Sequence, residues 1–119
     1  MSSKLADLPS NTIGQQLWCV IGARNSYLKA AEAQSWQGFS CPLEWDKTTE
    51  AKSVRQALES TGDQVSKFFE QAGDLSEGAV KFLLDLLEHE AQHHGQLARY
   101  LYGLKVGVPE SWKKRYNFD

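Results

Sequence analysis

The chain has 119 residues, of which 41% are hydrophobic and 24% charged, with a formal net charge of −2. This size predicts a single domain over residues 1–119, since a second core would leave both domains undersized. The weak negative charge argues against nucleic acid as a partner, and the one basic cluster, at residues 113–115, lies beside the C-terminus.

Cellular location is predicted from two features of the sequence. The two cysteines are too few for a disulfide scaffold, which favours a reducing compartment. No basic segment followed by an apolar one opens the chain, and its most apolar run, residues 82–87, is interrupted by Asp85. We therefore expect a soluble, cytoplasmic protein with no membrane partner.

The first predicted helix spans residues 10–35. Ser10, Asn11 and Thr12 offer oxygens for the N-cap. Apolar residues then recur at helical spacing, namely Ile13, Leu17, Val20, Ile21, Leu28 and Ala31. Another face carries a stripe of small residues, Cys19, Ala23, Ser26 and Ala30, which permits close approach of a second element. We expect two faces of this helix to be covered.

An aromatic loop and a second helix follow. Residues 36–47 break the helical pattern at Gly38 and Pro42, and we expect this loop to pack on the core rather than to line a pocket. The second helix is predicted over residues 48–72, ending at Gly73 in a left-handed turn. Its apolar residues are Val54, Leu58, Val65, Phe68 and Phe69.

A third helix begins at a capping-box variant in residues 74–77 and ends near Gly103 or Gly107. Its apolar series is Ala79, Phe82, Leu83, Leu86, Leu87, Leu97, Leu101 and Leu104. Pro109 then starts a short terminal segment. Because no run alternates between apolar and polar residues, the chain is predicted to be all-α, an up-and-down bundle of three long helices.

All three histidines lie in this third helix, where His89, Glu90 and His93 spell H-E-x-x-H. Histidines four residues apart on a helix present two nitrogens to one metal ion. Glu90 falls within the apolar arc, where a carboxylate is costly to bury without a partner, and a metal or a metal-bound water is one such partner. Alternatively, Glu90 pairs with a histidine or with an arginine such as Arg24, and His93 is an ordinary hydrogen-bonded core residue.

Two familiar metal sites fit this pattern less well. A zinc protease needs a third ligand further on, yet no histidine follows His94 and the only later acids are Glu110 and Asp119. A di-iron bundle would use Glu90 and His93 as one Glu-x-x-His pair, but the chain offers no well-placed glutamates to complete the set. The sequence therefore matches neither kind of metal site completely.

The sequence HEAQHHGQLARYLYGLKVGVPE, residues 89–110, is similar to the C-terminal signature of the DinB/YfiT-like family, and residues 11–30 resemble the helix that supplies that family's remaining histidine ligand. The resemblance implies a four-helix-bundle fold, entered here at the family's second helix. It also implies a divalent transition metal, zinc or nickel, held by His89 and His93 with Cys19 at the third ligand position. A thiolate binds zinc well, but the shorter side chain leaves a degenerate site as the alternative.

This resemblance implies a metal-dependent enzyme of the thiol S-transferase, isomerase or hydrolase kind, with Glu90 and His94 as proton carriers at a metal-activated thiol or water. The alternative function is a non-catalytic helical module that dimerises or binds a small-molecule ligand. Without the family's first helix an apolar flank would be exposed, so we expect a homodimer that covers it, with the small-residue stripe of the first helix as one surface for the contact.

Overall fold

A computed structural model describes residues 1–4 and 11–118, and every regular element in that part of the chain is a helix. The elements are α1 (Ile13–Ala33), a short 3-10 helix η1 (Trp45–Lys47), α2 (Ala51–Gln71), α3 (Glu77–Gly103) and α4 (Glu110–Tyr116). The all-α class is therefore confirmed for the described residues, and three long helices lie where the sequence pattern predicts them.

The predicted count of three helices is wrong by one, because the segment after Pro109 forms α4. Proline has a fixed backbone angle that suits the start of a helix. Glu110 lies in the first turn of α4 and three basic residues, Lys113, Lys114 and Arg115, lie in the last turn. The negative charge at the start of α4 and the positive charges at its end stabilise the helix, because each lies near the end of the helix dipole that carries the opposite partial charge.

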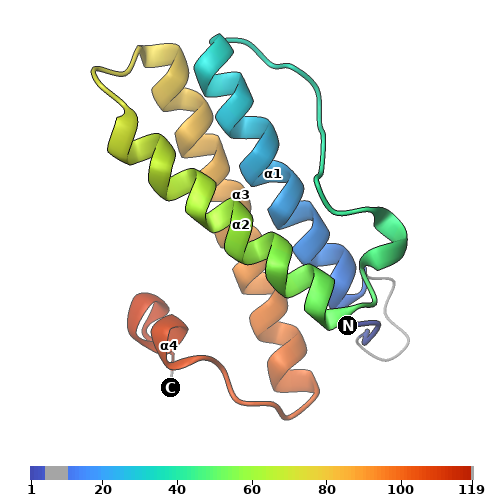
Figure 1. The fold of residues 1–119 in the computed structure, drawn as a ribbon. Helices are drawn as coiled ribbons and strands as arrows, with labels where there is room; N and C mark the ends of the chain where they lie inside the picture. Colours follow the sequence, from blue (N-terminus) through green and yellow to red (C-terminus); the bar gives the residue numbers. More distant parts are fainter. Residues whose placement is uncertain (5–10, 119) are drawn as a thin grey trace.

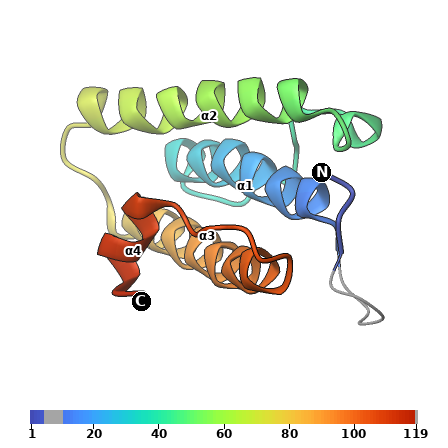
Figure 2. The ribbon, with the colours of Figure 1, turned by 90° about the horizontal axis from the view of Figure 1, so that it is seen from below.

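The central layer of the molecule is α1. Figure 2 shows α1 lying between α2 and α3, and α1 packs against both of them. On the α2 side, Ile21, Val54 and Leu43 form a buried cluster. The short α4 lies beside the lower part of α3, at the C-terminal end of the chain (Figure 1).

The N-terminal cap of α1 agrees with the sequence prediction, whereas the start of α3 and the end of α2 differ from it. Thr12 caps α1, and Thr12 and Gln15 form a reciprocal capping box. The start of α3 is capped by Ser76, whose Oγ accepts a hydrogen bond from Ala79 N at 3.1 Å, so the predicted start at residue 74 is two positions too early. Ala72 leaves α2 in an extended conformation, so the left-handed turn predicted at Gly73 is not needed.

The loop after α1 packs against Ser26, one of the small residues of the stripe on that helix. Ser40 N donates to Ser26 Oγ at 2.9 Å, and Ser26 Oγ donates to Ser40 O at 3.0 Å. A Cβ atom at Gly22 would lie 2.2 Å from the ring of Phe39, so a larger residue at this position would displace that ring. Ser26 of the stripe is thus covered by the chain's own loop, and the expectation that the stripe meets a second subunit stays a prediction.

None of the helices in the described residues combines the length and the apolar character that crossing a membrane requires.

Two glycines give a test of this packing. A Cβ atom at Gly14 would lie 1.9 Å from the carbonyl oxygen of Thr48, whereas one at Gly95 meets no atom within 4 Å. We expect Gly14→Ala to lower the free energy of unfolding by about 1–3 kcal/mol, because backbone must move. Gly95→Ala should raise it by about 0.5–1 kcal/mol, because alanine favours the helix. Urea denaturation measures both, and a Gly14→Ala variant as stable as wild type would contradict the packing.

Candidate functional site

His89 and His93 lie next to each other on the face of α3 that meets α1. Their ring centroids are 4.6 Å apart, as expected for positions one helical turn apart. The ring of Tyr27 on α1 lies 6.3 Å from that of His89. Nδ1 of His93 lies 3.0 Å from Gln16 Oε1, so this amide oxygen accepts the Nδ1 proton and Nε2 of His93 keeps its lone pair.

Burial favours the neutral form of both imidazoles. Burial lowers the pKa of His89, and burial together with the neighbouring His89 and His94 lowers the pKa of His93. Neutral imidazole is the form that binds a metal. Nδ1 of His89 is buried and has no hydrogen-bond partner among the described residues. An unpaired buried nitrogen costs stability, and it is the feature of the pair that best fits a bound ligand.

Cys19 is the residue that the family resemblance places at the third ligand position. Within residues 1–4 and 11–118, no three His, Cys, Asp or Glu side chains stand together as a group that could hold a metal ion. Cys19 and Cys41 are both half-buried; burial raises the pKa of each thiol, and Cys19 raises that of Cys41 further. A protonated thiol is a poor metal ligand. The role of Cys19 as third ligand therefore stays a prediction.

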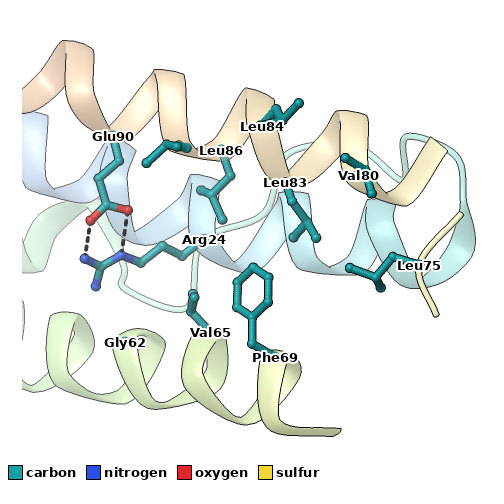
Figure 3. A pocket seen from close by; sticks show the side chains of 11 residues that line it. Arg24, Gly62, Val65, Phe69, Leu75, Val80, Leu83, Leu84, Leu86 and Glu90 are labelled. Carbon is teal, nitrogen blue, oxygen red and sulfur yellow. Dashed lines mark hydrogen bonds and ion pairs between the residues drawn. The ribbon is translucent and has the colours of Figure 1, made fainter. Parts of the chain in front are cut away.

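Glu90 forms an ion pair with Arg24 of α1. Arg24 Nε donates to Glu90 Oε2 at 3.1 Å, and Arg24 Nη2 donates to Glu90 Oε1 (Figure 3). The third nitrogen of Arg24, Nη1, donates to the carbonyl oxygen of Leu58 on α2 at 3.0 Å. The pairing with arginine is the alternative that the sequence leaves open, and the expected role of Glu90 in proton transfer stays a prediction.

His94 lies between Glu90 and α4. Its Nε2 is 3.8 Å from Glu90 Oε1, and its Nδ1 is 2.8 Å from the hydroxyl of Tyr116. The ring stacks on Trp112 with centroids 4.4 Å apart, and burial lowers the pKa of His94. Glu90 and His94, the two predicted proton carriers, are therefore close together, and each is held by contacts between helices.

An apolar groove runs between α2 and α3 with a volume of about 540 Å³ (Figure 3). It is lined by Arg24, Gly62, Val65, Phe69, Leu75, Val80, Leu83, Leu84, Leu86, Leu87 and Glu90. The Arg24–Glu90 pair lies at one end and Leu75 at the other, with Phe69 reaching from α2 toward Leu83 of α3. Only part of this lining is predicted from the sequence, namely Val65, Phe69, Leu83, Leu86 and Leu87, and the groove between the two helices is not.

The Arg24–Glu90 pair is tested by a double-mutant cycle. Both side chains are mostly buried, with exposed fractions of 17% and 21%. We expect Arg24→Met and Glu90→Gln each to lower the free energy of unfolding by about 2 kcal/mol, since each leaves a buried charge unpaired. The double variant should lose less than the sum of the two. The exposed Arg55–Glu59 pair is the control and should change stability by less than about 1 kcal/mol. Strictly additive losses would contradict a direct interaction.

Comparison of the chain with models of known protein families, with curated proteins and with solved structures finds no match. Membership of the DinB/YfiT-like family therefore stays a prediction that rests on the residues of the histidine helix and of α1.

Proposed function

We propose that the protein is a non-catalytic helical binding module of the DinB/YfiT type, and that the groove between α2 and α3 is its binding surface. The observation that carries this proposal is the groove itself. Its volume of about 540 Å³ lies within the range of ligand sites. Phe69, Val80, Leu84 and Leu87 all expose apolar surface along it. Contiguous apolar surface of this kind marks interaction sites on soluble proteins.

The groove selects for an uncharged, apolar occupant. Its walls are aliphatic apart from Phe69, and its only charged side chains, Arg24 and Glu90, neutralise each other. A charged guest would lose its hydration without gaining a partner, which is unfavourable. The apolar face of a helix or an uncharged small molecule would bury the exposed leucines without such a loss.

Binding of Nile red, an uncharged apolar dye, tests this function. We expect its fluorescence to rise with the protein over a dilution series. Leu87→Arg should weaken dye binding at least about tenfold, because it places a cation in an apolar groove. Val106→Arg is the matched control: Leu87 and Val106 are each 53% exposed, and Val106 does not line the groove. Equal dye binding by the two variants, or no binding by wild type at any dilution, would contradict the proposal.

A second candidate function is the metal-dependent catalysis implied by the family resemblance, with zinc or nickel as the metal. It is favoured by the unpaired Nδ1 of His89 and by the hydrogen bond that orients His93. The donor set does not fit a complete site, because a catalytic zinc needs three protein ligands and the described residues bring together two histidines. Metal-dependent catalysis therefore depends on whether Cys19 is the third ligand.

Elemental analysis of protein purified without a histidine tag tests this second candidate. If the pair holds a metal, zinc or nickel should be present at about one ion per chain, and His89→Ala or His93→Ala should abolish it, since one histidine cannot hold an ion against water. Cys19→Ser should also lose the metal if Cys19 is the third ligand. Metal content that is unchanged in both histidine variants would contradict the candidate, and retention in Cys19→Ser alone would contradict only the third ligand.

A further inference from the structure

We infer that the occupant of the groove is a second copy of this chain, whose α3 packs antiparallel against α3 of the first copy. The inference rests on the proposed binding role of the groove and names its partner. It starts from the residues Val80, Leu84, Leu87 and Ala91, which follow one another at spacings of four, three and four. This is the d-a-d-a spacing of a coiled-coil seam. Leu84, at its centre, is 60% exposed.

The seam is distinct from the face that α3 uses inside its own chain. Ala79, Leu86 and Leu97 of α3 are buried in the fold. The next seam position after Ala91 is His94, and there the chain supplies its own covering element, since Trp112 of α4 stacks on that ring. One end of the seam is thus already covered by a helix of the same chain. The remaining three turns, from Val80 to Ala91, are open for a helix from elsewhere.

Charge complementarity identifies that helix as a second α3. Lys81 and Glu88 occupy the two e positions beside the seam. If two copies of α3 run antiparallel about a two-fold axis near Leu84, Lys81 of each copy faces Glu88 of the other, so two ion pairs form. In a parallel pair the same charges would face g positions, which here are Ser76 and Leu83. Only the antiparallel arrangement matches the charges, and a two-fold axis makes the contact self-complementary.

The groove also provides a second wall for this contact. The α3 side of the groove runs from Val80 to Glu90, a length of about 15 Å along the helix. A second α3 that lies on the seam borders Phe69 of α2, whose exposed ring would then be covered. Leu84 of each copy would enter the groove of the other. The contact therefore buries the apolar residues that the single chain leaves open.

A charge-swap series on the full chain tests this arrangement by sedimentation velocity over a dilution series. Wild type should form a dimer. Lys81→Glu and Glu88→Lys should each raise the dimer dissociation constant about tenfold, because both ion pairs become repulsive. The double variant should restore the wild-type constant, since the charges are exchanged and still match. Lys52→Glu, an exposed change of the same size on α2, is the control and should leave dimerisation unchanged.

The other outcomes separate this inference from the proposed function. A monomer that binds Nile red in the groove would overturn the second copy as occupant and leave the binding role intact. A monomer that does not bind the dye would overturn both. A Leu84→Glu variant that still forms the dimer would show that the copies meet elsewhere, and would also overturn the inference. A double charge-swap variant that dimerises more weakly than either single variant would show that they meet in another register, with the same consequence.

Discussion

The guanidinium of Arg24 joins all three long helices. It extends from α1, forms an ion pair with Glu90 of α3 and donates a hydrogen bond to the carbonyl oxygen of Leu58 in α2. A buried carboxylate within the apolar arc of α3 would otherwise be costly. Because this cation satisfies partners on both neighbours of α1, it links α2 and α3 at one end of the groove, which extends from there toward Leu75.

This single interaction also separates the two candidate sites. On one side of Glu90 lies the apolar groove, whose polar end is neutral because Arg24 and Glu90 compensate each other. On the other side lies His94, 3.8 Å from the same carboxylate and covered by Trp112 of α4. Binding in the groove and chemistry at the histidines would therefore share one residue, and a change at Glu90 would affect both.

The sequence predicted the helices well because their apolar residues repeat over many turns. The α4 helix was missed because its seven residues are too short for such a repeat to be visible. Glu90 illustrates a different kind of success: a carboxylate in an apolar arc must have a partner, and Arg24 was one of the candidates. The position of Cys19 relative to the histidines was not predictable in this way, since it depends on the register between α1 and α3.

The groove could not be predicted from the sequence for a related reason. Both of its walls can be recognised, as the wide apolar arc of α3 and the stripe of α2 that contains Val65 and Phe69. Whether two such stripes meet or stay apart depends on how α2 and α3 diverge from α1, which is set by tertiary contacts such as that of Arg24. Secondary-structure patterns carry no information on that separation.

The central claim is that two copies of this chain bind each other through the surface between α2 and α3. Methyl NMR spectra of leucine- and valine-labelled protein over a dilution series test it most directly. The account predicts concentration-dependent shifts at Val65, Leu84 and Leu87, while the core methyls of Val20 and Val54 stay unchanged. Shifts confined to Leu104 and Val106, which are exposed but lie outside the groove, or no shifts at any concentration, would contradict it.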